Sequence, residues 1–243
     1  MTTPRFYHPA LDPLATHGDL PPEAAHHAAK VLRLKDGDHI VLFDGRGGEY
    51  PAVITGMAKQ SVSVEISPKL ERECESSLKV TLAQGISGGD KMDFTLQKAV
   101  ELGVAHIQPI ACERSVVKLS GDRAEKRLRH WRQVVISACE QCGRNRVPEV
   151  APILSLHDWL GTLNGEELRL TLAPGAPGGL KDLGPPAVPV TLLIGPEGGL
   201  APGEMTAAAS QGFTSVRLGP RVLRTETAAL AALAAMQALW GDF

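Results

Sequence analysis

A chain of 243 residues with 43% hydrophobic and 21% charged side chains has the composition of an ordinary globular protein, which argues against a disordered or fibrous chain. It is long enough for one large domain or two smaller ones, each with its own core. No apolar run approaches the roughly 20 residues of a membrane span, and the first ten residues lack the apolar segment of a secretory signal, so we expect a cytoplasmic protein.

Residues 1–72 are expected to form a small β-rich domain. Val62, Val64 and Ile66 alternate with polar residues, which is the period of a half-buried strand. Short strands separated by turns that contain glycine suggest a small barrel, preceded by one helical segment. The helix is expected at residues 26–33, a turn at 35–38, and strands at 40–43, 50–54 and 61–66.

Residues 73–243 are expected to form a second domain, with a charged linker at residues 70–77. Predicted strands alternate with predicted helices here, which indicates an α/β domain with a parallel sheet. Gly103 is a suitable residue to end the first of these helices. Strands are expected at 78–84, 104–110, 168–172, 190–194 and 216–218, and helices at 91–102, 124–142, from 202 until Gly212, and at 225–240.

The last helix, residues 225–240, is apolar around its whole circumference because it consists almost entirely of Ala, Leu and Met. A helix of that kind is buried on all sides. One core of this size is not expected to cover it fully. We therefore expect this helix to lie at a subunit interface in a homodimer.

Charge is unevenly distributed although the net charge is only −2. Residues 113–146 contain nine Lys and Arg against four Asp and Glu, so this block is basic. Such a block is either a phosphate-facing surface or the solvated face of a helix. Cys139 and Cys142 have the C-x-x-C spacing, but neither Cys74 nor Cys112 has a partner at ligand spacing. We expect the pair to be small residues on a helix face, with no metal.

Two glycine-containing segments near the C-terminus form the most informative part of the chain. Residues 192–199 read LLIGPEGG, and residues 216–229 read VRLGPRVLRTETAA. Each joins a short apolar run to a Gly-Pro turn and then to a helix. Glycine and proline at the end of a strand let the backbone approach a ligand closely, and ligands bind at the carboxyl ends of parallel strands. We therefore expect one ligand site between these two loops.

The glycine pattern does not match the common nucleotide-binding motifs. No G-x-G-x-x-G follows a strand, and residues 85–91 match a phosphate-binding P-loop only loosely. The sequence also lacks a Ser-His-Asp set, a nucleophile elbow and a cluster of metal-binding carboxylates. The expected site therefore binds its ligand mostly through backbone groups.

The two loops resemble the cofactor motifs of the SPOUT methyltransferases, and more narrowly those of the RsmE type, which methylate N3 of a uridine in small-subunit (16S) ribosomal RNA. IGPEGG at 194–199 and LGPRVLRTETA at 218–228 carry the resemblance. The sequence differs at Ala201, where a serine helix cap is more usual. Further segments similar to the family lie at 26–33, 42–45, 91–104, 113–115 and 140–144, so the similarity covers nearly the whole chain.

The resemblance implies an N-terminal PUA-like barrel that holds RNA, a C-terminal SPOUT domain with a trefoil-knotted parallel sheet, a homodimer, and S-adenosylmethionine as cofactor. The family places the adenine and ribose among the loops after Leu172, Ile194 and Leu218. The cofactor-binding residues are then expected to be Leu172, Ala173, Ile194, Gly195, Pro196, Glu197, Gly198, Gly199, Leu218, Gly219, Leu223, Arg224, Thr225, Thr227 and Ala228.

The chemistry of the implied reaction suggests which side chains are catalytic. The N3 proton of uridine must leave before or during methyl transfer, and a neighbouring cation would stabilise the resulting anion. Arg221 and Arg224 are the candidates, and Arg221 is the first choice. Glu197 or Glu226 could accept the proton, but both could instead hold the loops shut, and for Glu197 this structural role is favoured.

The implied substrate is 16S rRNA or the small ribosomal subunit, and phosphate contacts supply most of the affinity for RNA. With only 4% aromatic residues, a stacking platform for single-stranded RNA is not expected, and recognition by shape and charge fits better. The candidate phosphate contacts are Arg5, Lys30, Arg33 and Arg46 in the first domain, and Lys91, Lys98, Arg114 and Arg144 in the second.

Two alternatives remain open from the sequence. The first is a SPOUT enzyme that methylates a ribose 2′-hydroxyl in transfer or ribosomal RNA. The second is a non-catalytic RNA-binding or assembly protein that has kept the fold.

Overall fold

The computed structural model describes residues 3–58 and 61–243, and its contacts divide the chain into two compact units. The first unit contains Met1–Glu75 together with Cys139–Val147, and the second contains Ser76–Ala138 and Pro148–Phe243. The sequence-based boundary was placed after residue 72. The inclusion of residues 139–147 in the first unit was not expected, because the sequence carries no local signal for it.

The first unit is a five-stranded sheet in the order β1-β3-β4-β5-β2, in which β1 pairs with β3 in parallel and the other pairs are antiparallel. Alternate residues of β5, Val62, Val64 and Ile66, point into a core that also contains Phe6 and Ile54. The predicted β-rich domain is thus observed. Its elements are β1 (Arg5–Tyr7), β2 (His17–Asp19), α1 (Pro22–His26), η1 (His27–Val31), β3 (His39–Phe43), β4 (Tyr50–Met57) and β5 (Val62–Ile66).

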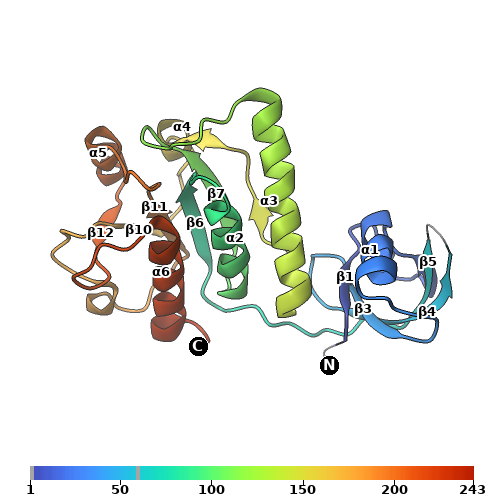
Figure 1. Cartoon of the computed structure of the whole chain (residues 1–243). Helices are drawn as coiled ribbons and strands as arrows, with labels where there is room; N and C mark the ends of the chain where they lie inside the picture. The colour runs from blue at the N-terminus through green and yellow to red at the C-terminus, as the bar shows by residue number, and fades with distance from the viewer. Residues whose placement is uncertain (1–2, 59–60) are drawn as a thin grey trace. The chain divides into compact units, whose positions relative to one another are not determined.

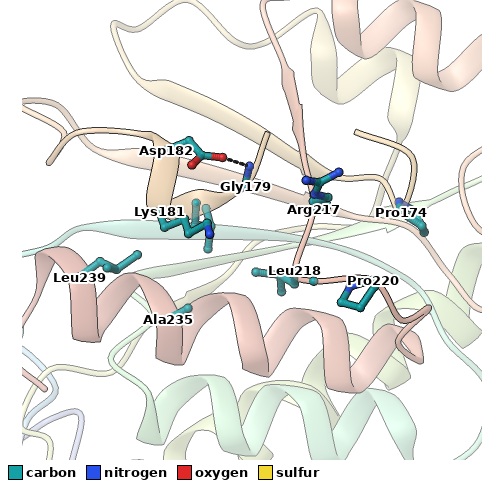
Figure 2. Close-up of a pocket in the computed structure, with 11 residues that line it drawn as sticks. Pro174, Gly179, Lys181, Asp182, Arg217, Leu218, Pro220, Ala235 and Leu239 are labelled. Atoms are coloured by element: carbon teal, nitrogen blue, oxygen red, sulfur yellow. Dashed lines mark hydrogen bonds between the residues drawn. The ribbon is translucent and has the colours of Figure 1, made fainter. Parts of the chain in front are cut away.

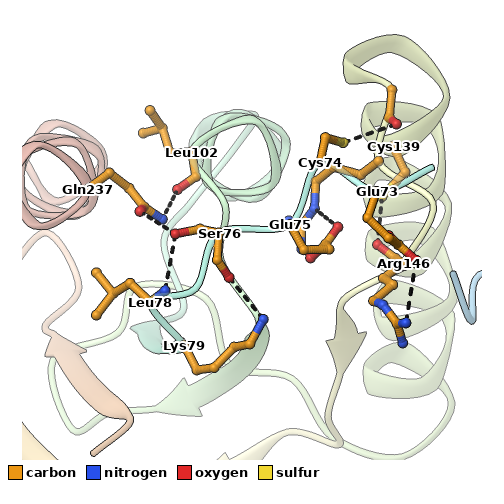
Figure 3. A network of polar contacts seen from close by, with 12 residues as sticks. Glu73, Cys74, Glu75, Ser76, Leu78, Lys79, Leu102, Cys139, Arg146 and Gln237 are labelled. Atoms are coloured by element: carbon orange, nitrogen blue, oxygen red, sulfur yellow. Dashed lines mark hydrogen bonds and ion pairs between the residues drawn. The ribbon is translucent and has the colours of Figure 1, made fainter. Parts of the chain in front are cut away.

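The segment 139–147 is attached to the first unit by polar contacts. The backbone nitrogen of Tyr7 donates to Glu140 Oε1 at 3.0 Å. Arg144 makes a two-pronged ion pair with Glu75, with distances of 2.9 and 2.6 Å. Arg146 pairs with Glu73 at 3.4 Å, as Figure 3 shows. Two of the three contacts join an arginine to a carboxylate.

The second unit is built on a parallel sheet with the strand order β12-β10-β11-β6-β7-β8, with β9 paired to β7 (Figure 1). All its strand pairs are parallel, which confirms the predicted α/β class. The central strand β11 is buried along its whole length, as expected for a strand covered on both faces. The strands are β6 (Val80–Gly85), β7 (His106–Ala111), β8 (Glu149–Val150), β9 (Leu154–Ser155), β10 (Leu168–Leu172), β11 (Val190–Ile194) and β12 (Thr214–Val216).

Helices connect these strands, and α2 and α6 pack against each other (Figure 1). Gly103, with φ of +77°, follows the end of α2 as predicted. Asp93 of α2 accepts hydrogen bonds from His130 at 2.6 Å and from Trp131 at 3.1 Å, which joins α2 to α3. The helices are α2 (Lys91–Glu101), α3 (Gly121–Cys142), α4 (Leu156–Leu160), the short η2 (Leu180–Asp182), α5 (Pro202–Ser210) and α6 (Thr225–Trp240).

Helix α6 is buried on one face only within a single chain. Ala229, Ala232, Leu233 and Met236 are fully buried, whereas Leu239 is 49% exposed. A single chain therefore leaves part of this apolar helix uncovered, as the sequence led us to expect. No helix in the described part of the protein is both long and apolar enough to cross a membrane.

The two ends of the second unit meet at Gln237 of α6. Ser76, the first residue of the unit, donates to Gln237 Oε1 at 2.7 Å, and Gln237 Nε2 donates to the carbonyl of Leu102 at 3.1 Å (Figure 3). Both side-chain groups of Gln237 are thus satisfied although the residue is buried. The contact ties the last helix to the beginning of the unit and to the end of α2.

Candidate active site

A cavity of about 520 Å³ lies where β10 and β11 end and α6 begins. Its position agrees with the rule that ligands bind at the carboxyl ends of parallel strands. Its volume is within the range of pockets that hold small organic molecules. The residues lining it that the sequence had assigned to the cofactor are Leu172, Ile194, Gly195, Pro196, Glu197, Gly198, Gly199, Leu223, Arg224, Thr225 and Ala228.

A smaller cavity of about 80 Å³ adjoins the first and shares Leu172, Pro174, Leu223 and Ala228 with it. Ala173, Leu218 and Gly219 of the predicted cofactor set line this smaller cavity, and so does Arg221. Thr227 is exposed on α6 and lines neither cavity. Sequence reasoning missed Pro174, Leu200, Met205 and Val222, and had assigned Lys91 to RNA alone, although all five line the larger cavity.

Beyond the larger and the smaller cavity of the two loops, a third cavity of about 610 Å³ continues along α6 from Leu218 and Gly219 (Figure 2). Leu218, Ala235 and Leu239 give it an apolar side, and Lys181 and Arg217 add two cations. Asp182 also lines it, but its carboxylate accepts from the backbone nitrogen of Gly179 at 2.8 Å. The hollowed surface therefore extends well beyond the two predicted loops.

Close backbone packing shapes the first loop of the larger cavity. A Cβ atom at Gly85, the last residue of β6, would lie 2.5 Å from the backbone nitrogen of Pro196. Gly199 has φ of +68°, a conformation that side chains disfavour. The glycines of this region therefore allow the loop 195–199 to pack directly on the end of β6.

Glu197 holds this loop against the segment that begins α2. Its Oε1 accepts from the backbone nitrogen of Gly88 at 2.9 Å and from Lys91 Nζ at 3.3 Å. Burial alone would raise the pKa of the Glu197 carboxyl. Hydrogen bonds from the amides of Gly88 and of Glu197 itself, together with the ammonium of Lys91, outweigh burial and lower this pKa below its ordinary value. Glu197 is thus an anion engaged in loop contacts.

Neighbouring loops are held by similar contacts. Glu204 in the first turn of α5 accepts from the backbone nitrogens of Ala201 and Glu113, both at 2.8 Å. The first of these bonds caps α5 although Ala201 lacks the usual cap side chain. Arg114 donates to the carbonyl of Gly198 at 3.3 Å. The loop 195–201 is thus fastened to the loop after β7 as well as to α2.

Arg221 and Arg224 differ from the other polar residues at the site. Arg224 lines the larger cavity just before α6, and Arg221 lines the smaller one. Within the described ranges 3–58 and 61–243, neither guanidinium has a hydrogen bond or an ion pair. Both charges are therefore available to a ligand. Glu226, the other candidate proton acceptor, lines neither of these cavities.

The candidate RNA contacts separate into two groups. Lys30, Arg33, Arg46 and Arg114 are exposed, and Lys91 and Lys98 are partly exposed. Arg5 and Arg144, by contrast, are committed within the first unit: Arg5 pairs with Glu49 at 2.7 Å and donates to Asn145, and Arg144 pairs with Glu75. Their guanidinium groups are buried against these partners, so the structure gives these two arginines a structural role that the sequence did not reveal.

Two of the cysteines are buried, protonated thiols. Burial raises the pKa of Cys112 and of Cys139 to about 12. Among the residues that the structure describes, no group of three or more His, Cys, Asp and Glu side chains is placed to hold a metal ion.

The chain matches two family models. The RNA methyltransferase domain model matches residues 74–237, and the RNA methyltransferase PUA domain model matches residues 20–67. The second match confirms the predicted PUA-like domain. Together the two models cover both units of the fold.

Proteins similar to this chain are named as methyltransferases. The ribosomal RNA small subunit methyltransferase E of Buchnera aphidicola is 33% identical over 91% of this chain and 87% of its own length, and that of Bacillus subtilis is 32% identical over 88% and 87%. Among solved structures, the methyltransferase E from Neisseria gonorrhoeae bound to S-adenosyl methionine is 45% identical over the whole of both chains, with a TM-score of 0.93. A putative methyltransferase from Legionella pneumophila in complex with the same cofactor is 40% identical over the whole of both chains, with a TM-score of 0.95.

Proposed function

This chain belongs to the RNA methyltransferase family that contains the ribosomal RNA small subunit methyltransferase E proteins, and on that premise we propose that it methylates N3 of a uridine in 16S rRNA with S-adenosylmethionine. One observation carries the proposal. The two glycine-containing loops, which lie far apart in the sequence, line one cavity of about 520 Å³ at the ends of parallel strands. That arrangement suits a cofactor held mainly by peptide groups.

The walls of this cavity fit an adenosyl group. Leu172, Ile194 and Leu223 supply apolar surface, and the loop 195–199 supplies peptide groups. S-adenosylmethionine, when bound, supplies an electrophilic methyl group on a sulfonium. We propose that the cofactor-binding residues are those of the predicted set that line the two cavities, without Thr227. Lys91, Pro174, Leu200, Met205 and Val222 are added to the set because they also line the larger cavity.

The two unpaired arginines would act on the uracil. Loss of the N3 proton leaves a negative charge on the base, and a guanidinium without a protein partner can stabilise that charge. Arg221 is proposed as the catalytic cation, and Arg224 as a second cation at the rim of the larger cavity. Glu197 is proposed to hold the loop, because a carboxylate with a lowered pKa is a weak proton acceptor at neutral pH.

RNA binding is proposed to use the accessible cations of both units. Lys30, Arg33 and Arg46 in the first unit, and Lys91, Lys98 and Arg114 in the second, would contact phosphates. Arg5 and Arg144 are not included, because their side chains are only 13% and 6% exposed and each is paired with a carboxylate. The substrate is 16S rRNA or the small subunit, and the reaction takes place in the cytoplasm, where ribosomal subunits are made.

A homodimer is proposed as the working form. The support is the partly exposed apolar face of α6, including Leu239, which a second copy of the chain would cover. The trefoil knot that the family resemblance implies belongs to the same proposal. Sedimentation of the purified chain would test the oligomeric state, and a monomer at micromolar concentration would contradict the homodimer.

Calorimetry with S-adenosylmethionine is the most direct test of the function. We expect one site per chain, whereas a non-catalytic RNA-binding protein with the same fold would show no binding. Methyl transfer to purified small subunits should then follow. Mass mapping of 16S rRNA from cells with and without the gene identifies the position. A methyl group on a ribose, or an unchanged small subunit, would overturn the uridine-N3 assignment.

A further inference from the structure

Three segments of the second unit are joined by a chain of hydrogen bonds beside the proposed cofactor cavity. Gln84, at the end of β6, donates from Nε2 to Thr225 Oγ1 at 2.9 Å. Thr225, the first residue of α6, donates from Oγ1 to the carbonyl of Gly195 at 2.6 Å. Thr225 and Gly195 both line the cavity. The chain therefore links β6, α6 and the Gly-Pro turn after β11.

The direction of these hydrogen bonds is fixed by chemistry. The Gln84 amide group also donates to the carbonyl of Gly85 at 3.0 Å, so its nitrogen must face both partners. An amide nitrogen can only donate, so Thr225 Oγ1 must accept from it. The hydroxyl proton of Thr225 is then directed to Gly195. Thr225 thus has no proton left to offer a ligand.

The amide of Gln84 is buried, and only its nitrogen has hydrogen-bond partners in the described part of the chain. Gln84 is fully buried, and its Oε1 has no hydrogen-bond partner among residues 3–58 and 61–243. Burying an acceptor without a partner is unfavourable, and an apolar side chain would avoid that cost. What the glutamine supplies, and an apolar residue would not, is the donor that orients Thr225.

We infer that Gln84 and Thr225 are positioning residues that fix the Gly195–Pro196 peptide relative to the first turn of α6, and that this arrangement sets the affinity for S-adenosylmethionine. The inference rests on the proposed function. It changes the role expected for Thr225, which acts through Gly195 rather than by donating to the cofactor. It also adds Gln84, which is not among the residues that line the cavity.

Binding of S-adenosylmethionine to the full-length chain, measured by calorimetry, tests the inference. Thr225→Val keeps the shape and removes the hydroxyl, and Gln84→Met removes the donor. Each variant should lower the affinity for S-adenosylmethionine about tenfold. This corresponds to the upper end of the range for the net contribution of one buried hydrogen bond. Thr225→Ser keeps the hydroxyl and should restore most of the affinity. The double variant should bind no more weakly than Thr225→Val, because both changes break the same chain.

The protein offers a matched control in Thr171 of β10. This threonine is also buried and donates to a backbone carbonyl, that of Leu193, at 3.0 Å, but it does not line the cavity. Thr171→Val should leave the affinity for S-adenosylmethionine unchanged. If Thr225→Val binds as tightly as the wild type, or if Thr171→Val loses as much affinity, the inference is wrong. Absence of binding by the wild type would instead overturn the proposed function, and the inference with it.

Discussion

Arginines in the first unit and arginines around the cavities of the second unit have different roles. Arg5 is paired with Glu49, whose side chain is only 3% exposed, and Arg144 is paired with Glu75. Arg221 and Arg224 line cavities and have no partner within the described part of the chain. An arginine whose charge is already neutralised stabilises the fold, whereas one without a partner can act on a ligand. Residue type alone does not separate the two roles.

The largest expected effect is on the stability of the first unit. Glu49 lies between Arg5 and Arg72, at 2.7 and 3.1 Å. Glu49→Ala would leave the mostly buried Arg5 without its counter-charge, and breaking a buried pair from one side costs about 3–5 kcal/mol. Urea unfolding measures the loss. Arg72→Ala is the control, because Arg72 is 75% exposed and its pair should contribute at most about 1 kcal/mol. Equal losses in the two variants would contradict the structural role assigned to Arg5.

The next effect concerns turnover. Arg221→Ala should lower the rate of methyl transfer by about 10²–10³-fold, the usual loss when a group that stabilises developing charge is removed. Affinity for S-adenosylmethionine should stay near that of the wild type. Arg217 lines the same small cavity, but its guanidinium donates to the carbonyl of Ala176 at 3.3 Å, so Arg217→Ala should affect the rate far less. A fully active Arg221→Ala enzyme would remove this residue from the mechanism.

The smallest expected effect is on the free energy of unfolding, through the loop that Glu197 holds. Glu197→Gln should reduce the free energy of unfolding by about 1 kcal/mol at neutral pH through weakened hydrogen bonds. The pKa of Glu197 is lowered in the folded protein from an ordinary value of 4.5. A group with a lowered pKa contributes stability above its unfolded pKa and loses it as the pH falls through the folded value. The difference between wild type and variant should therefore shrink below about pH 4.5.

Denaturation curves at several pH values measure this difference. Glu125→Gln provides the control, because Glu125 is 73% exposed and lies 3.7 Å from Arg129, so its removal should change stability little. A Glu197→Gln protein as stable as the wild type at pH 7 would show that the contacts with Gly88 and Lys91 do not hold the loop.

Elements with a clear period or a clear end residue were predictable. The helix before Gly103 and the buried strand β11 agree with the sequence-based ranges to within a residue. Shorter elements were not predictable. β1 has three residues and is defined by its pairing with β3, and α4 has five. Such segments are too short to show a period, and their structure comes from partners elsewhere in the chain.

The candidate site was predictable where it consists of backbone. The Gly-Pro turns indicated the location of the cavity, because glycine and proline restrict local geometry directly. The side-chain partners were not predictable, since Arg5 and Asn145 are 140 residues apart, as the bond between them shows. Lys91 resembled a surface cation in the sequence, and only its contact with Glu197 reveals that it belongs to the cavity.

The bond between Ser76 and Gln237 has a consequence for protein synthesis. The strands of the first unit lie within residues 5–66 and can pair as soon as that stretch has been translated. The second unit places β6 beside β11 and α2 beside α6, so its core waits for the last helix to be made. A nascent chain halted before α6 would leave the face of α2 that packs on α6 uncovered, and Ser76 without its partner Gln237. Truncation that removes α6 should therefore cause aggregation rather than a shorter working enzyme.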